Sequence, residues 1–290
     1  MQLDGPLVST DWLAAQLTAP RLRVFDTTVV LQPRSAGFGY LPMSGRAAWA
    51  AGHIPGAGFL DVIEELSDRN STLPFMMPPA EQFAAAMAAQ GVGDDAVVVL
   101  YNKGLPMWAT RVWWMLRSIG FEQVAVLNGG VDKWLQEGRP QSTAAPAHAR
   151  GQLSVRAQMD MWVDKAAMLR LIEDGQPVAV NALAPAVYSG EKNQYGRPGH
   201  LPGTFNVYYG DLIDPVTGEF HPPQALRPLF EPSAALAAER VVAYCGGGIS
   251  ATMDALALHL CGQRNVAVYD GSMSEWVKDP SLPLTLGDAP

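Results

Sequence analysis

The chain contains the same unit twice, and this repeat constrains its fold more than any other feature. The segment GHIPGA at residues 52–57 recurs as GHLPGT at residues 199–204. Two further pairs of blocks match in the same order, 96–101 with 240–245 and 124–130 with 266–272. Because a repeated unit of this length folds as a domain of its own, the sequence predicts two tandem homologous domains.

A segment rich in Pro, Ala and Ser separates the two units. Residues 140–150 show no apolar periodicity, which is typical of a connecting segment. We therefore expect a linker at 140–152, between a first domain of residues 1–139 and a second domain of residues 153–290. The length of 290 residues suits two domains of ordinary size.

Each unit reads as an alternation of helices and short apolar strands. The expected order is helix, strand, loop, strand, helix, strand, helix, strand, helix. The runs at 96–100 and 241–244 are continuously apolar, as expected for strands covered on both faces. The pattern predicts an α/β fold, with a mainly parallel sheet flanked by helices in each domain. Ligands bind such sheets beyond the carboxyl ends of the strands, where Cys245 is expected.

Cys245 opens a glycine-rich loop between a predicted strand and a predicted helix. Gly246, Gly247 and Gly248 permit a tight turn and leave backbone N–H groups uncovered. After Ile249, we expect Ser250 to be the N-cap of a helix that runs to about residue 260. A bowl of N–H groups at a helix N-terminus favours a negative charge on the sulfur or on a bound oxyanion. Cys245 is thus the candidate nucleophile.

The repeated GH-hydrophobic-PG blocks, the NGG segment at 128–130 and the CGGGIS loop together resemble the two-domain sulfurtransferases of the rhodanese superfamily. The resemblance covers nearly the whole chain. It implies a rhodanese-like fold in each half and an active site in the cleft between the halves. The first domain has Tyr101 where the second has Cys245, so the resemblance implies that only the second domain is catalytic.

The resemblance also implies an activity. Cys245 would take a sulfane sulfur from thiosulfate or 3-mercaptopyruvate, hold it as a persulfide, and pass it to cyanide or a thiol, in two covalent steps. No dissociable cofactor is expected. The partners would be a small anionic sulfur donor and a thiol, cyanide or protein sulfur acceptor. The alternative is a sulfur-carrier or partner-binding protein with weak turnover.

Some cysteine phosphatases share this fold and must be considered. Their loop is longer and ends in an arginine that clamps the phosphoryl group. Here the corresponding position is Ala251. The sequence therefore argues against a phosphatase.

The sequence leaves the preferred donor open. The loop is uncharged, whereas thiosulfate-using relatives have basic residues there and mercaptopyruvate-using relatives have a hydroxyl at the position of Gly247. Val187 stands where both types usually have arginine, and Asn181 replaces a usual aspartate. The remaining candidates for substrate binding are Arg197, Lys192, Lys103 and His53. Arg197 suits a bidentate carboxylate contact.

His53 has two interpretations. In one branch of the family the first-domain histidine assists proton transfer near the cysteine. The recurrence of His53 as His200, in the domain that already has the cysteine, favours a structural role in the turn. Trp113 and Trp114 are expected in the core or between the domains.

Composition narrows the class of partner and the compartment. A net charge of −8 and a pI near 5.1 argue against nucleic acid or an anionic membrane as the main partner. The N-terminus resembles no secretory signal, and we expect a cytoplasmic protein. The two cysteines exclude a disulfide framework, and Cys261 is expected to be inert because a helix separates it from Cys245. Nothing has metal-ligand spacing.

Overall fold

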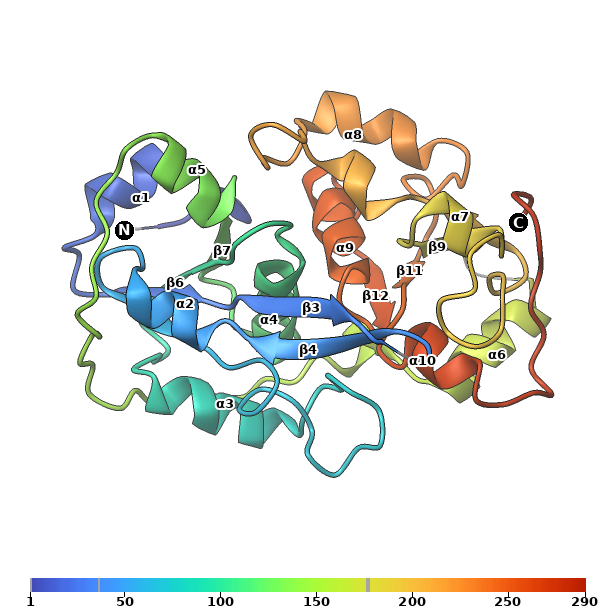
Figure 1. Ribbon diagram of the computed structural model, residues 1–290, viewed down its shortest axis with the longest axis horizontal. Coiled ribbons are helices and arrows are strands. Elements are labelled where there is room, and N and C mark those ends of the chain that lie inside the picture. Colours follow the sequence, from blue (N-terminus) through green and yellow to red (C-terminus); the bar gives the residue numbers. More distant parts are fainter. Residues whose placement is uncertain (1, 36, 176–177) are drawn as a thin grey trace.

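The computed structural model describes residues 2–35, 37–175 and 178–290. Two α/β domains lie side by side, with the first on the left of Figure 1 and the second on the right. Each domain is built on a parallel five-stranded sheet with helices packed around it. Among the described residues, no helix is long and apolar enough to cross a membrane. The predicted tandem α/β fold is confirmed.

The two sheets have the same plan. The strand order is β1-β7-β6-β2-β5 in the first and β10-β9-β11-β12-β8 in the second, so β6 and β11 are the central strands. The first sheet consists of β1 (Leu7–Val8), β2 (Leu22–Asp26), β5 (Ala57–Phe59), β6 (Val97–Tyr101) and β7 (Val124–Leu127). The second consists of β8 (Trp162–Val163), β9 (Val178–Asn181), β10 (Thr204–Asn206), β11 (Val241–Tyr244) and β12 (Val266–Tyr269).

Helices connect these strands. Those of the first domain are α1 (Thr10–Gln16), α2 (Arg46–Ala51), α3 (Ala80–Ala89), α4 (Met107–Ser118) and α5 (Gly130–Gln136). Those of the second are α6 (Lys165–Glu173), α7 (Pro185–Tyr188), α8 (Pro223–Phe230), α9 (Ala251–Leu260) and α10 (Ser272–Trp276), with short 3₁₀ turns η1 (Met159–Met161) and η2 (Tyr209–Leu212).

The first helix of each unit begins at a side-chain cap. Ser9 Oγ accepts the N–H of Trp12 at 3.1 Å, and Asp164 Oδ1 accepts the N–H of Ala167 at 2.7 Å. Such caps satisfy a backbone donor that has no partner inside the helix. The repeat noticed in the sequence therefore extends to the start of the corresponding helices.

Helices α4 and α9 pack against each other across the domain boundary. The hydroxyls of Thr110 and Thr252 form a hydrogen bond of 2.8 Å. Trp113 contacts His259 edge-on, with 5.7 Å between ring centroids, and Trp114 contacts Trp162 at 6.4 Å. Trp113 and Trp114 are buried, which confirms their predicted packing role.

An antiparallel hairpin in the first domain was not anticipated. Strands β3 (Val29–Pro33) and β4 (Tyr40–Ser44) pair where the sequence suggested only a loop. In Figure 1 this hairpin extends from the first domain toward the second. Its inner face lines a pocket with Leu31, Tyr40 and Pro42, and its outer face exposes Val30, Leu41 and Met43. Alternation of side chains along a strand produces the two faces.

The segment after each domain folds back onto that domain. Ser142 forms an antiparallel bridge with His53, and Thr285 forms the same bridge with His200. The indole N–H of Trp134 donates to Pro140 O at 2.8 Å, as that of Trp276 does to Pro283 O at 2.9 Å. Residues 140–152 thus lie along the first domain rather than spanning open space.

Candidate active site

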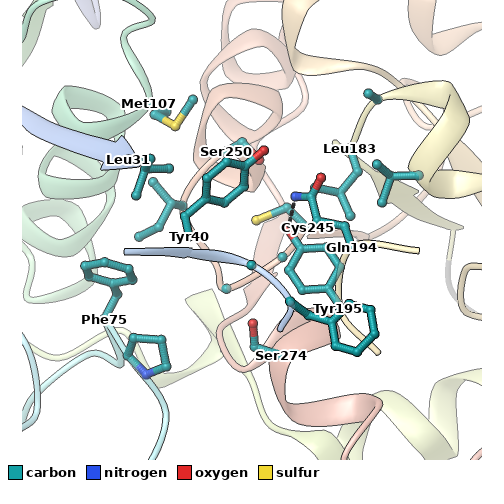
Figure 2. A pocket seen from close by; sticks show the side chains of 18 of the residues that line it. Leu31, Tyr40, Phe75, Met107, Leu183, Gln194, Tyr195, Cys245, Ser250 and Ser274 are labelled. Carbon is teal, nitrogen blue, oxygen red and sulfur yellow. Dashed lines mark hydrogen bonds between the residues drawn. The ribbon is translucent and has the colours of Figure 1, made fainter. Parts of the chain in front are cut away.

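Cys245 lies at the carboxyl end of β11, the central strand of the second sheet. Only 2% of the residue is exposed. It lies in a pocket of about 870 Å³ whose walls come from both domains. Figure 2 shows Tyr40, from the first-domain hairpin, and Tyr195, from the second domain, on either side of the Cys245 side chain. The predicted position of the cysteine, at a strand end between the domains, is confirmed.

The three loop glycines differ in how much space surrounds them. Gly248 has φ +73, and a Cβ there would lie 2.7 Å from the carbonyl oxygen of Asp270. A Cβ on Gly246 would overlap the Tyr195 hydroxyl. A Cβ on Gly247, by contrast, would lie 3.7 Å from Ser274 Oγ, an ordinary contact. Only Gly248 therefore needs the left-handed backbone that glycine permits.

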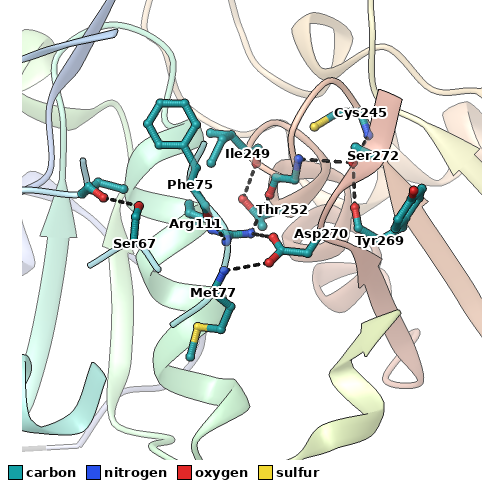
Figure 3. A network of polar contacts seen from close by, with 12 residues as sticks. Ser67, Phe75, Met77, Arg111, Cys245, Ile249, Thr252, Tyr269, Asp270 and Ser272 are labelled. Atoms are coloured by element: carbon teal, nitrogen blue, oxygen red, sulfur yellow. Dashed lines mark hydrogen bonds and ion pairs between the residues drawn. The ribbon is translucent and has the colours of Figure 1, made fainter. Parts of the chain in front are cut away.

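Ser272 holds the two ends of the loop together. Its hydroxyl oxygen accepts the N–H of Cys245 at 3.1 Å and the N–H of Gly248 at 3.2 Å, and its hydroxyl donates to Tyr269 O at 2.6 Å (Figure 3). In the described chain, the N–H groups of Gly246, Gly247, Ile249 and Ser250 donate to no protein acceptor. Those four donors are left for an anion.

A buried ion pair supports the loop from the first domain. Arg111, on α4, donates from Nη1 to Asp270 Oδ1 at 2.6 Å and to Gly248 O at 3.0 Å. Its Nη2 donates to Phe75 O at 2.6 Å, and Asp270 Oδ2 accepts the N–H of Met77 at 2.7 Å (Figure 3). The backbone of the cysteine loop is thereby tied to both domains.

Tyr195 presents a phenol to the same loop. Its hydroxyl oxygen accepts from Gln194 Nε2 at 3.1 Å (Figure 2). Burial raises the pKa of Tyr195 well above its usual value, and the nearby charge of Cys245 raises it further. The phenol therefore keeps its proton at neutral pH. In the described chain the hydroxyl accepts from Gln194 and donates to no protein acceptor, so its proton can be donated into the pocket.

The structure separates the predicted substrate-binding residues. Lys192 lines the pocket, but Lys103 is exposed outside its lining. Arg197 also lies outside: its guanidinium donates to the backbone carbonyls of Asp279 and Leu282, each at 2.8 Å. These two hydrogen bonds hold the Arg197 side chain away from the pocket, so the geometry lends no support to the expectation that it contacts substrate. Val187 does line the pocket, as an apolar wall.

His53 is also outside the pocket. Its Nδ1 pairs with Trp49 O at 2.8 Å and its Nε2 with Ala144 O at 3.2 Å. His200 makes the equivalent contacts, with Tyr188 O at 2.9 Å and Ala289 O at 3.1 Å. With both ring nitrogens against backbone carbonyls, the geometry favours the structural role for His53 and lends no support to its candidacy as a substrate-binding residue.

The remainder of the predicted loop fits the geometry with one exception. Ile249 and Ser250 both line the pocket. Ser250 immediately precedes α9, but its hydroxyl makes no capping hydrogen bond, and its backbone is already helical at φ −65 and ψ −23. The expected side-chain cap is therefore wrong. Cys261, at the other end of α9, is buried and free, as expected, and burial raises its pKa.

Several residues around Cys245 were not identified from sequence. They include the two cations Arg34 and Lys278 and the tyrosines at 40, 195, 208 and 209, all of which line the pocket. They are contributed by the hairpin, by the loops before and after β10, and by the turn after α10. The one available signal was the concentration of aromatic residues in loops that follow strands of a parallel sheet.

Comparison with known proteins identifies the family. The model of the rhodanese-like domain matches residues 9–137 and matches again at residues 166–279. The chain belongs to the rhodanese family. The two matches correspond to the two domains of the structure, and the boundaries of each match fall within one sheet and its helices.

Rhodanese-family relatives match the chain over nearly its full length. The human 3-mercaptopyruvate sulfurtransferase is 37% identical, over 95% of this chain and 93% of its own. The thiosulfate sulfurtransferase of Cricetulus griseus is 34% identical, over 93% and 91%. The crystal structure of SseA, a 3-mercaptopyruvate sulfotransferase from Escherichia coli, superposes with a TM-score of 0.81 at 30% identity, over 92% of this chain and 98% of its own. The expectation of an enzyme of the sulfurtransferase class is confirmed.

Proposed function

We propose that the protein transfers a sulfane sulfur from thiosulfate or 3-mercaptopyruvate to a thiol or cyanide through a persulfide on Cys245. The observation that carries the proposal is the position of Cys245. It lies at the base of a two-domain pocket, inside a loop with four uncommitted backbone N–H donors. Such donors stabilise a sulfur anion without a protein charge beside it.

The first half-reaction forms a sulfur–sulfur bond. The Cys245 thiolate attacks the outer sulfur of thiosulfate, the bond between that sulfur and the sulfonate sulfur breaks, and sulfite leaves with the electron pair. With 3-mercaptopyruvate, the carbon–sulfur bond breaks instead, and the enolate of pyruvate leaves and takes up the proton that the mercapto group gives up. In both cases the persulfide anion remains on Cys245, where the N–H groups of the loop hold it.

The second half-reaction regenerates the thiolate. Cyanide or an acceptor thiolate attacks the outer sulfur of the persulfide, and the sulfur–sulfur bond breaks with its electrons returning to Cys245. The products are thiocyanate or the persulfide of the acceptor. This is covalent catalysis in two steps, and the loop stabilises sulfur anions in both of them.

Two pocket residues have proposed roles beside Cys245. The Tyr195 phenol donates a hydrogen bond to the anion that develops at the loop, in place of the hydroxyl that Gly247 lacks. Lys192 provides positive charge for the carboxylate or sulfonate of the donor. An uncharged loop at 246–248 favours an organic donor over thiosulfate, because no basic side chain follows Cys245 directly.

The carrier interpretation is less favoured by the geometry. A sulfur carrier must present its persulfide to a partner protein, and Cys245 is 2% exposed beneath the first-domain hairpin. A small molecule fits the pocket, whereas a protein acceptor has to insert an extended segment. Sulfur transfer between small molecules is therefore the function that we propose.

The test compares the wild type with Cys245→Ser. Each protein receives thiosulfate or 3-mercaptopyruvate with cyanide, thiocyanate is measured, and intact mass is recorded after incubation with donor alone. We expect thiocyanate and the mass of one added sulfur only with Cys245 present. Cys261→Ser is the matched control and should behave as wild type. Equal thiocyanate from wild type and Cys245→Ser would refute the mechanism, and added sulfur without turnover would favour the carrier.

A further inference from the structure

The walls of the Cys245 pocket are aromatic on both sides. Phe75 and Trp108, from the first domain, contact each other edge-on with 5.0 Å between ring centroids. Tyr208 and Tyr209 form a second pair in the other domain, at 4.7 Å. Figure 2 shows Tyr40 and Phe75 on the first-domain side and Tyr195 on the other. Flat rings on both sides suit a flat ligand, because aromatic pairs prefer stacked or edge-to-face contact.

The turn of the first-domain hairpin adds a further aromatic side chain to the pocket lining. Phe38, in the turn between β3 and β4, lines the pocket, yet 54% of the residue is exposed. A ligand that covers this phenyl group removes apolar surface from water, which makes binding more favourable. The wall of the second domain is apolar as well, through Leu183, Ala184 and Val187.

Apart from Cys245 itself, the charged side chains that line the pocket are all basic. Among the residues that the structure describes, its lining includes Arg34, Lys192 and Lys278 and no aspartate or glutamate. Within the described residues, none of these three cations forms an ion pair. On a chain of net charge −8, this is a local reversal of potential. It attracts an anionic ligand.

The pocket is far larger than thiosulfate or 3-mercaptopyruvate requires. Its volume of about 870 Å³ is comparable to sites that hold ligands of drug size, roughly 300–1,000 Å³. Those small donors would contact the loop and leave the aromatic walls uncovered. Most of the apolar surface around Cys245 is therefore unexplained by the donors named above.

We propose that this pocket selects a substrate that joins a planar aromatic body to an anionic group, with the reacting sulfur at Cys245. The inference rests on the proposed sulfur transfer and specifies its substrate class. Either the sulfur donor or the sulfur acceptor can have this chemistry, since both react at the same sulfur. The rings of Tyr208, Tyr209 and Phe75 hold the body, and the cations hold the anion.

Binding is tested apart from turnover with Cys245→Ser, which forms no persulfide. Three unreactive probes are titrated by calorimetry: 3-phenylpropionate, propionate and 3-phenylpropylammonium. We expect 3-phenylpropionate to bind at least ~10-fold more tightly than either of the others, a difference of about 1.4 kcal/mol. Equal affinity for propionate would overturn the aromatic part of the inference, and equal or tighter binding of the ammonium would overturn the anionic part.

Matched variants locate the binding. Phe38→Ala is expected to weaken the binding of 3-phenylpropionate at least threefold. Lys278→Gln should weaken the binding of both 3-phenylpropionate and propionate. Leu41→Ala is the control: it lies on the outer face of the same hairpin and is 49% exposed, so it should change no affinity. All three positions are exposed, which limits effects on folding. An unchanged affinity in both Phe38→Ala and Lys278→Gln would place the probe elsewhere and overturn the inference.

Two reactive pairs then distinguish donor from acceptor in the wild type. For the donor, persulfide formation from benzenethiosulfonate is compared with that from methanethiosulfonate. The Cys245 thiolate takes the outer sulfur and the sulfinate leaves with the electron pair. For the acceptor, discharge of the preformed persulfide by 4-mercaptobenzoate is compared with discharge by 3-mercaptopropionate, each corrected for its rate with a free persulfide.

A preference of ~10-fold for the aromatic member in one pair supports the inference and assigns the aromatic body to that substrate. No preference in either pair, with all four compounds reacting, overturns it. If no donor loads Cys245 while Cys245→Ser still binds 3-phenylpropionate selectively, the proposed function fails and the binding site stands. The two failures are therefore distinguishable.

Discussion

Arg111 and Asp270 form a buried ion pair across the domain boundary, next to the carbonyl of Gly248. The Nη1 of Arg111 lies 2.6 Å from Asp270 Oδ1 and 3.0 Å from Gly248 O, and the Arg111 side chain is fully buried. The pair therefore connects the packing of the two domains to the backbone of the loop that contains Cys245.

Replacing Arg111 with methionine should destabilise the protein and impair the loop. It leaves the Asp270 carboxylate buried without its cation, which costs about 3–5 kcal/mol in the free energy of unfolding. Denaturant unfolding measures the loss. The double variant Arg111→Met/Asp270→Asn should recover part of it, since no charge is left unpaired. Arg117→Met, on the same helix but paired with the exposed Glu122, is the control and should change stability little. Equal losses in Arg111→Met and Arg117→Met would contradict this prediction.

Tyr195→Phe should slow sulfur transfer with little effect on KM. The phenol is expected to hydrogen-bond the anion that develops at the loop, and loss of a hydrogen bond to a charged group reduces the rate by about 10–100-fold. Persulfide formation on Cys245, followed by stopped-flow absorbance and mass, measures the rate. Tyr208→Phe keeps the aromatic ring that lines the pocket and removes only its hydroxyl, so it should retain the wild-type rate. A kcat of Tyr195→Phe within twofold of wild type would exclude a role for the phenol.

Gly248→Ala and Gly247→Ala should differ sharply although they are neighbours. At Gly248 a side chain must adopt φ +73 and crowd Asp270, with about 1–2 kcal/mol for the backbone alone. We expect loss of most activity and a lower Tm. At Gly247 the added methyl meets only an ordinary contact, so activity and Tm should stay near wild type. Thiocyanate assays and thermal unfolding check both, and similar behaviour of the two variants would argue against the loop geometry.

Asp254 should make stability depend on pH. It is fully buried on α9, neither carboxyl oxygen has a partner among the described residues, and burial raises its pKa well above the usual value. The folded state then holds this proton more tightly than the unfolded state. Stability is therefore greatest below the unfolded pKa of about 4 and falls as pH rises toward the folded pKa, by on the order of 1 kcal/mol per pH unit.

Asp254→Asn cannot ionise and should flatten that dependence. We expect it to be more stable than wild type at pH 8 and similar at pH 4, by chemical denaturation at a series of pH values. Asp279→Asn, at a half-buried residue whose pKa is lowered by hydrogen bonds from Ser281, should leave the slope intact. Parallel slopes for wild type and Asp254→Asn would show that Asp254 is ionised in the folded state.

The repeat and the local patterns made much of this molecule predictable. The GH-hydrophobic-PG blocks revealed the duplication, continuous apolar runs revealed the buried parallel strands, and Cys245 followed from a strand end beside glycines. These features are local, or are repeated in a way that one sequence displays. The lining of the pocket was not accessible in this way, because its walls come from segments of both domains that lie far apart in the sequence.

The residues that lie elsewhere than the sequence suggested share a physical cause. Arg197 and His53 have polar side chains beside a loop, and the sequence does not show that backbone carbonyls far along the chain take up their nitrogens. Arg111 was overlooked because it lies within an apolar helical pattern, and its partner is 159 residues away. The hairpin was missed because its exposed strands, at 29–33 and 40–44, lack the continuous apolar runs of the central strands.

The trailing segments at 140–144 and 283–289 indicate which unit was duplicated and where a single domain can be excised. Each returns to its own domain, capping the indole of Trp134 or Trp276 and the imidazole of His53 or His200. The duplicated unit is therefore longer than the sheet and its helices. It includes the trailing segment that packs back onto the domain. An excised first domain that stops at Gln136 would lack its trailing segment. A fragment that extends through Ala149 would keep the contacts of that segment with Trp134 and His53.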